Sequence, residues 1–89
     1  MDSTLSNKSV LVVGGCGFLG HHIVSQLLEC HAQVSVLDFK LDRNRIQSVQ
    51  YYQADISVKT DVETVLASVR PQVIIHTASP TALTTEPAL

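Results

Sequence analysis

The sequence predicts an α/β fold built on a parallel sheet of four strands. Four short segments rich in valine, isoleucine and tyrosine are interspersed with two segments whose apolar residues recur every three or four positions. All four glycines fall within residues 14–20, directly after the first of the short segments. Strands that alternate with helices form parallel sheets through right-handed crossovers. We expect the strand order 3-2-1-4, in which a ligand crevice opens at the carboxyl ends of the first and fourth strands.

The first strand and the first helix are predicted between residues 9 and 30. Ser9–Val13 is apolar on both faces, as a central strand of a parallel sheet should be. The helix is predicted over Phe18–Cys30. Its apolar residues share helical spacing and form one stripe: Leu19, Ile23, Val24, Leu27 and Leu28.

Two further strands are predicted on either side of a polar loop. Gln33–Asp38 alternates between polar and apolar residues and is rich in valine, which favours a strand. The charged segment 39–48 is interpreted as a loop. Val49–Gln53 is predicted as a short third strand, in which one of the two adjacent tyrosines should lie in the core and the other on the surface.

A second helix and a last strand complete the pattern. Thr60 and Glu63 match a capping box, which predicts the start of the helix at this point. The helix should end at Arg70, because a residue that precedes a proline is pushed out of the helical conformation. Val73–His76 is predicted as a buried fourth strand.

Length and composition exclude several classes of protein. A chain of 89 residues allows one small domain. The net charge of −2, without a cluster of lysine and arginine, argues against nucleic-acid binding. No apolar run approaches the roughly 20 residues of a membrane span. Neither the two cysteines nor the histidines have the spacing of a metal site, and we expect no metal. We expect a cytoplasmic location, with both cysteines reduced.

The glycine segment predicts a dinucleotide-binding turn. It follows a strand and opens a helix, so that the N–H groups at the start of the helix face a pyrophosphate. A turn with a structural role alone is the alternative. The fold is then a partial, truncated Rossmann (doubly wound) sheet over residues 9–80, with a polar segment at 1–8 and a tail at 81–89. We assign cofactor contacts to the turn and the first helical residues: Gly14, Gly15, Gly17, Phe18, Leu19 and Gly20.

Asp38 is predicted to bind the adenosine ribose. It ends the second strand, eighteen residues after Gly20, close to the spacing of about 20 that a ribose-binding acid requires. A carboxylate at this place accepts hydrogen bonds from the ribose hydroxyls and repels a 2′-phosphate, which favours NAD over NADP. Lys40, Arg43 and Arg45 could weaken that preference, and Arg43 is a further candidate contact. The alternative is that Asp38 caps a turn.

Asp55 and Ile56 are predicted to contact the adenine. They follow the third strand, where the carboxylate could accept a hydrogen bond from the adenine amino group while Ile56 packs on the ring. An aspartate that merely ends a strand is the alternative.

These segments resemble the N-terminal part of the extended short-chain dehydrogenase/reductase family. The resemblance lies in residues 13–20 (VGGCGFLG), 36–38 (VLD), 54–56 (ADI) and 73–79 (VIIHTAS). It implies further cofactor contacts from Thr77 and Ala78, after the fourth strand. The first of these segments departs from the family pattern, because valine stands at position 13 where the family has threonine.

Within that family the sequence is most similar to the 3β-hydroxysteroid and sterol-4α-carboxylate 3-dehydrogenases. The resemblance implies the NAD(P)-binding part of an enzyme that transfers hydride from a 3β-hydroxyl group to NAD, with the sterol bound by the complete enzyme alone. Association of the complete enzyme with the endoplasmic reticulum would fit this class. The 89 residues contain no Tyr-x-x-x-Lys, so no catalytic residue is assigned and the chain itself is expected to be inactive. Alternatives are a separate NAD(H)-binding module without catalysis, and part of a nucleotide-sugar epimerase or reductase.

The fourth strand is expected either to make the isolated chain unstable or to mediate its self-association. Parallel strands are normally covered on both faces and paired on both sides. With nothing beyond Val73–His76 in the predicted sheet, this strand would be an apolar edge, which favours pairing with another chain.

Overall fold

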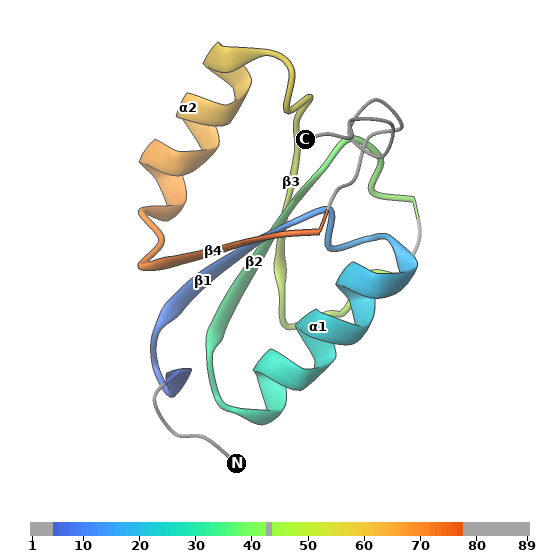
Figure 1. The fold of residues 1–89 in the computed structure, drawn as a ribbon, viewed down its shortest axis with the longest axis vertical. Helices are drawn as coiled ribbons and strands as arrows, with labels where there is room; N and C mark the ends of the chain where they lie inside the picture. Colours follow the sequence, from blue (N-terminus) through green and yellow to red (C-terminus); the bar gives the residue numbers. More distant parts are fainter. Residues whose placement is uncertain (1–4, 43, 78–89) are drawn as a thin grey trace, which may run out of the picture.

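The computed structural model describes residues 5–42 and 44–77 and confirms the predicted fold (Figure 1). The four strands form one parallel sheet in the order β3-β2-β1-β4. The elements, in chain order, are β1 (Ser9–Val13), α1 (Phe18–Glu29), β2 (Gln33–Asp38), β3 (Gln50–Gln53), α2 (Lys59–Val69) and β4 (Val73–His76). Three of the four strands have the predicted bounds, β3 starts one residue later, and α1 ends one residue earlier.

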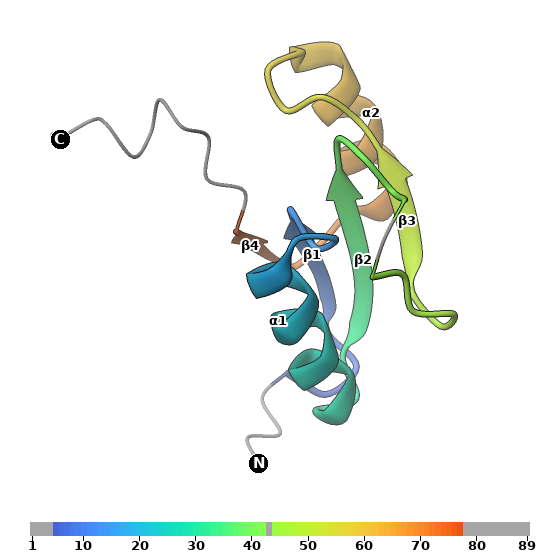
Figure 2. The ribbon, with the colours of Figure 1, turned by 90° about the vertical axis from the view of Figure 1, so that its right-hand side faces the viewer.

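Strand β1 lies at the centre of the hydrophobic core. It pairs with β2 on one side and with β4 on the other, with Val12 opposite Val36 and Ile75. Its residues alternate between two apolar clusters: Val10 and Val12 join the cluster under α1, whereas Leu11 joins the cluster that includes α2. The two helices therefore cover opposite faces of the sheet (Figure 2).

The buried stripe of α1 is narrower than the sequence predicted. Val24 and Leu27 are buried against the sheet, but Leu19 is 61% exposed and Phe18 is 81% exposed. Gly20 takes the inward position in the first turn, and helical neighbours point about 100° apart. The side chains of Phe18 and Leu19 therefore point outward, and including Leu19 in the core stripe was wrong.

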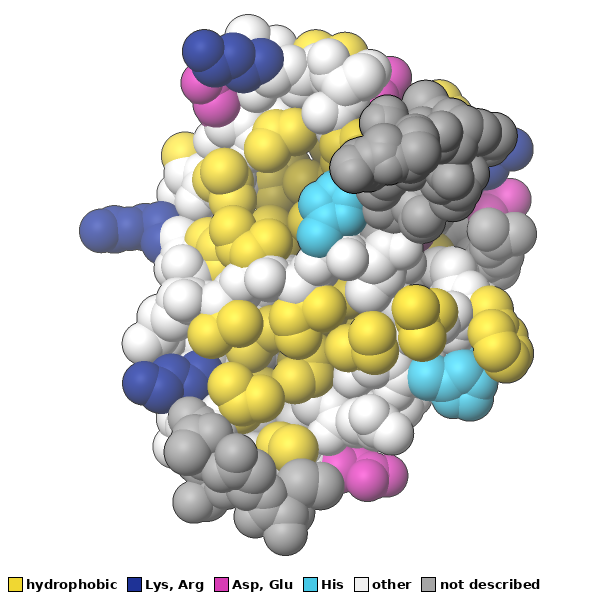
Figure 3. All heavy atoms as spheres, viewed as in Figure 1, with side chains coloured by type: hydrophobic (Ala, Val, Ile, Leu, Met, Phe, Trp, Pro, Cys, Tyr) yellow, Lys and Arg dark blue, Asp and Glu magenta, His cyan; other side chains and the backbone are white. Residues whose placement is uncertain are grey.

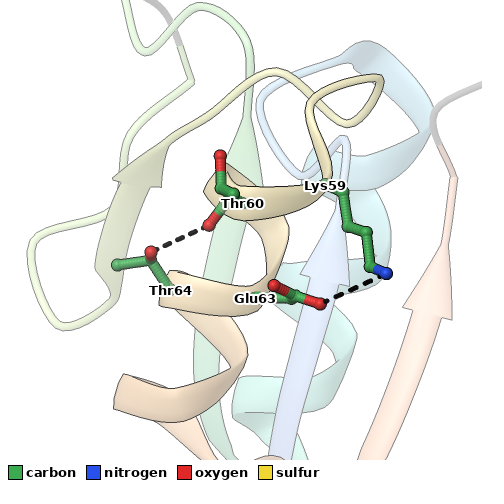
Figure 4. A network of polar contacts seen from close by, with 4 residues as sticks. All are labelled: Lys59, Thr60, Glu63 and Thr64. Carbon is green, nitrogen blue, oxygen red and sulfur yellow. Dashed lines mark hydrogen bonds and ion pairs between the residues drawn. The ribbon is translucent and has the colours of Figure 1, made fainter.

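The capping box predicted at Thr60 and Glu63 is also wrong. The helix begins at Lys59, its N-cap is Val58, and no side chain caps it. Thr60 lies inside the first turn, where its carbonyl oxygen accepts a hydrogen bond of 2.8 Å from the Thr64 hydroxyl (Figure 4). Figure 4 also shows Glu63 beside Lys59, with 3.9 Å between the carboxylate and the ammonium. Both side chains are exposed, so this pair contributes little to stability.

An upstream turn explains the earlier start of α2. Asp55 accepts hydrogen bonds of 2.9 and 2.7 Å from the N–H and the hydroxyl of Ser57. The Asp55 carbonyl accepts from the N–H of Val58 at 2.9 Å, which closes the turn. Since this turn already directs the chain into the helix at Lys59, Thr60 lies inside the helix and cannot serve as its N-cap.

The end of α2 agrees with the sequence prediction. Arg70, which precedes Pro71, leaves the helical conformation with φ of 50°, and its N–H donates to the Leu66 carbonyl at 2.8 Å. In the described parts of the chain, neither helix has the length and apolar character needed to cross a membrane.

The outer edge of β4 has no partner strand among the described residues. Ile74 is 53% exposed on the α2 side of this strand. Beside it lies an apolar groove of about 210 Å³, whose lining includes Leu11, Val62, Leu66 and Ile74. Figure 3 shows hydrophobic side chains on both sides of the backbone of β4. The α2 face of the sheet therefore continues as apolar surface up to its edge.

Candidate functional site

Three glycines, two in the loop between β1 and α1 and one in the first turn of α1, are required by the fold itself. Gly14 has φ of 89°, which side chains rarely tolerate, and its N–H donates to the Leu37 carbonyl at 2.7 Å. A Cβ on Gly15 would lie 2.6 Å from the Cγ2 atom of Val36. A Cβ on Gly20 would overlap the carbonyl oxygen of Gly14 and lie 2.8 Å from the Cα atom of Gly15. Helix, loop and β2 thus touch where no side chain fits.

Gly17 differs from the other three, because the protein leaves room for a side chain there. Its φ of −77° and ψ of 174° suit any residue. The nearest atom to a Cβ would be the Gly14 carbonyl oxygen at 3.5 Å, an ordinary contact. Glycine at this position therefore leaves space beside the loop that the fold does not fill. This is the space that a pyrophosphate would need for close approach to the backbone.

The start of α1 offers unpaired hydrogen-bond donors at that space. Gly17 is the N-cap, no side chain caps the helix, and its first turn contains no acidic residue. The first N–H groups of a helix have no acceptor within it and carry a partial positive charge, which suits an anion. In contrast, the first turn of α2 contains Asp61, whose carboxylate accepts from the N–H of Asp55 at 3.3 Å.

Asp38 ends β2 and lies directly against the glycine loop. Its Oδ2 atom accepts a hydrogen bond of 2.9 Å from the N–H of Cys16, and its Oδ1 atom accepts one of 2.7 Å from the N–H of Phe39. The second bond is a local contact with the backbone of the next residue in the chain. Each carboxylate oxygen can accept two hydrogen bonds. Both oxygens therefore retain capacity for the hydroxyls of a ribose.

A small pocket brings the predicted adenosine-binding residues together. It measures about 90 Å³ at the carboxyl ends of β1 and β2, and its lining includes Gly14, Asp38, Asp55 and Ile56. A larger open depression of about 510 Å³ lies toward the amino ends of the strands, around Gln33. That depression contains none of the predicted site residues, so the smaller pocket is the better candidate.

The charged form of Asp55 is stabilised by two hydrogen bonds from Ser57. The hydrogen bonds from the Ser57 hydroxyl and N–H lower the pKa of the Asp55 carboxyl below its ordinary value. The neighbouring Ile56 is 39% exposed, so an apolar surface is available beside this carboxylate. Ser57 was not predicted as part of the site, although aspartate followed two residues later by serine is a common turn signal.

The remaining predicted residues lie at the end of β4 or outside the described chain. Thr77 follows β4, and both its N–H and its hydroxyl donate to the carbonyl oxygen of Val13 at 2.8 Å. This places Thr77 beside the end of β1, where the glycine loop begins. Arg43 and Ala78 lie outside the described residues.

Comparison with solved structures supports the same architecture. The structure is similar to the crystal structure of the Thermus thermophilus UDP-glucose 4-epimerase in complex with NAD, with a TM-score of 0.75 and 36% sequence identity. That similarity covers 80% of this chain and 24% of the epimerase chain.

The curated relatives of the chain include sterol-4-alpha-carboxylate 3-dehydrogenases. The chain is 36% identical over 78 residues to the sterol-4-alpha-carboxylate 3-dehydrogenase of Schizosaccharomyces pombe, covering 82% of this chain and 23% of that protein. It is 39% identical over 75 residues to the corresponding Bos taurus enzyme, covering 82% and 20% respectively. The chain thus spans a fifth to a quarter of the length of these curated relatives.

The family itself is identified by a match over most of the chain. Residues 11–87 match the model of the 3-beta hydroxysteroid dehydrogenase/isomerase family. This match includes the glycine loop, Asp38 and the Asp55 turn, and it agrees with the resemblance drawn from the sequence. The chain belongs to the 3-beta hydroxysteroid dehydrogenase/isomerase family.

Proposed function

We propose that this chain is the NAD-binding N-terminal part of a 3β-hydroxysteroid or sterol dehydrogenase. The observation that carries the proposal is the unfilled space at Gly17, between an uncapped helix start and the rest of the glycine loop. In the complete enzyme, the bound nicotinamide would accept hydride from the carbon that bears the 3β-hydroxyl group. The residues of this chain bind and orient the cofactor and take no part in proton transfer.

Each group of site residues has a distinct part in this proposal. The first-turn N–H groups at Phe18, Leu19 and Gly20 hold the pyrophosphate. Asp38 accepts hydrogen bonds from the ribose, while Asp55 and Ile56 receive the adenine. Thr77, Arg43 and Ala78 remain expected contacts that follow from the family resemblance.

The charges around Asp38 support NAD rather than NADP. The Asp38 carboxylate would repel a 2′-phosphate at the ribose it binds. Arg45, one of the cations that could offset this repulsion, has its guanidinium carbon 5.1 Å from the centre of the Tyr51 ring. Because the Arg45 guanidinium is engaged with that ring, it is less available to a phosphate beside Asp38.

The complete protein could instead act on a nucleotide sugar. The similarity to a UDP-glucose 4-epimerase structure supports this second candidate, whereas the family model and the sterol-enzyme relatives favour a sterol. A separate NAD(H)-binding module without catalysis is the third candidate. The intact mass of the native polypeptide separates this module from the other two. A species at 9.7 kDa supports the module, and a species several times heavier supports the cofactor-binding part of a full enzyme.

The first prediction concerns Gly17→Ser. Serine is a favourable N-cap, so the melting temperature should stay the same or rise. Its side chain would occupy the pyrophosphate space and take up a first-turn N–H group, and the affinity for NAD should fall roughly tenfold to hundredfold. Calorimetric titration with NAD and thermal denaturation measure the two effects. Unchanged affinity in this stable variant would remove Gly17 from the site.

The second prediction concerns Asp38→Ala and the milder Asp38→Asn. Both should weaken NAD binding more than NADP binding, because a charged acceptor for the ribose and a repulsive charge are lost together. Asp38→Asn retains an oxygen that can accept from the N–H of Cys16. Asp42→Asn is the control, since it makes the same charge change at an exposed position of the following loop. Equal losses for NAD and NADP would exclude Asp38 from ribose binding.

The third prediction is that residues 1–89 alone do not oxidise 3β-hydroxysterols. The chain has no Tyr-x-x-x-Lys to act as acid and base. A purified preparation incubated with NAD and a 3β-hydroxysterol should produce no NADH, as monitored by absorbance. Turnover by this preparation would contradict the assignment of the chain as a cofactor-binding part without catalysis.

The fourth prediction is that the 89-residue chain self-associates through β4. The unpaired strand edge and the adjacent apolar groove support this proposal. Analytical ultracentrifugation should detect species larger than a monomer, and Ile74→Lys should shift them toward monomer by placing a charge on the exposed apolar face. A compact wild-type monomer with a sharp melting transition would contradict it.

A further inference from the structure

The loop between β2 and β3 is fastened to the glycine loop by one side chain. The Nδ2 atom of Asn44 donates a hydrogen bond of 2.9 Å to the carbonyl oxygen of Cys16. The N–H of the same Cys16 donates to the Asp38 carboxylate, also at 2.9 Å. Both backbone polar groups of Cys16 are therefore held by side chains from outside the glycine loop.

A hydrogen bond to the Cys16 carbonyl also restrains the N–H of Gly17. The carbonyl of Cys16 and the N–H of Gly17 belong to one planar peptide unit, so the orientation of one fixes the other. The N–H of Gly17 donates to the Gly14 carbonyl at 3.1 Å, and this bond closes the turn just before α1. Asn44 thus restrains the peptide that borders the unfilled space at Gly17.

Asn44 is itself held by Tyr51 of β3. The Tyr51 hydroxyl accepts a hydrogen bond of 2.6 Å from the N–H of Ile46 and makes a longer contact of 3.4 Å to the Asn44 carbonyl. Burial raises the pKa of the Tyr51 hydroxyl above its ordinary value, so the group stays protonated at neutral pH. The Arg45 guanidinium lies over the Tyr51 ring. Residues 44–46 are therefore anchored to a strand of the sheet.

The exposure of Asn44 argues against a role in the core. The residue is exposed and adopts a left-handed conformation with φ of 54°, which asparagine tolerates better than most residues. Its polar contact is directed to the glycine loop, at the place where the pyrophosphate is proposed to bind.

We propose that Asn44 is a positioning residue for the dinucleotide, which holds the Cys16–Gly17 peptide in the orientation that receives the pyrophosphate, with Tyr51 as its support. This inference rests on the proposed NAD binding. A residue that merely attaches the loop would affect binding of every part of the ligand when it is replaced. A positioning residue for the pyrophosphate should, when replaced, weaken binding of the pyrophosphate more than binding of the adenosine.

Four variants of the 89-residue chain test this inference, and the fourth, Tyr51→Phe, removes the hydroxyl that supports Asn44. Asn44→Gly removes the side chain and tolerates the positive φ, whereas Asn44→Asp retains the shape without an N–H donor. Gln47→Glu is the matched control, because it makes the same amide-to-carboxylate change at an exposed position of the same loop. Each variant is titrated with NAD and with adenosine, which lacks the pyrophosphate, by nuclear magnetic resonance, and its melting temperature is recorded.

The expected result is a selective loss. Asn44→Gly and Asn44→Asp should bind NAD about tenfold more weakly, the scale of one hydrogen bond, with a smaller change for adenosine and little change in melting temperature. Gln47→Glu should bind both ligands as the wild type does. Tyr51→Phe should lose NAD affinity in the same direction by a smaller factor.

Two results would overturn the inference while leaving the proposed function intact. The first is that the wild-type chain binds NAD and the Asn44→Gly variant binds NAD with equal affinity. The second is an equal loss for NAD and adenosine, which would make Asn44 an attachment of the loop alone. A wild-type chain that does not bind NAD would instead overturn the proposed function.

Discussion

Helix α1 approaches the end of β1 so closely that no Cβ fits at Gly20, and the rest of the site depends on this contact. A side chain there would collide with the backbone of Gly14 and Gly15. The close approach sets the start of α1 at the carboxyl edge of the sheet, beside the ends of β1 and β2. The first-turn N–H groups, the Asp38 carboxylate and the small pocket beyond it then share one edge. A wider separation would move the helix start away from Asp38 and divide the site.

The four glycines of the loop and the first turn of α1 serve two different purposes. Constraints within the protein, namely a positive φ or close contact with neighbouring atoms, require glycine at positions 14, 15 and 20. None of these constraints applies to Gly17, because its backbone angles suit any residue and its surroundings leave room for a Cβ. The positions of the glycines in the sequence do not show which purpose each one serves. The packing around each glycine separates those that the fold requires from the one that leaves room for a ligand.

The sequence predicted what depends on regular patterns, and it missed what depends on individual side-chain contacts. Strand bounds followed from residue type, since β1 and β2 consist largely of residues that suit a sheet buried on both faces. The capping box failed because the Asp55–Ser57 turn already directs the chain into α2. Tyr51 and Tyr52 are both half-buried, packed against opposite clusters, rather than one buried and one exposed.

The same limit applies to the candidate site. Glycine spacing and the ends of strands are visible in a sequence, and they predicted four residues that line one pocket: Gly14, Asp38, Asp55 and Ile56. Asn44 was not predicted. Its contact with Cys16 joins residues 28 positions apart through an irregular loop, for which no periodic pattern exists.

The unequal burial of the two helices divides the domain into parts of different local stability. Helix α1 buries Gly20, Val24 and Leu27, whereas α2 buries Val65 alone. Segments with few buried apolar contacts open at a smaller free-energy cost than the core of the same domain. Helix α2 should therefore fray and reform while β1, α1 and β2 stay folded. The start of α1, where we propose that the pyrophosphate binds, belongs to the part that stays folded, so this site would survive excursions of α2 that disturb the neighbouring Asp55 turn.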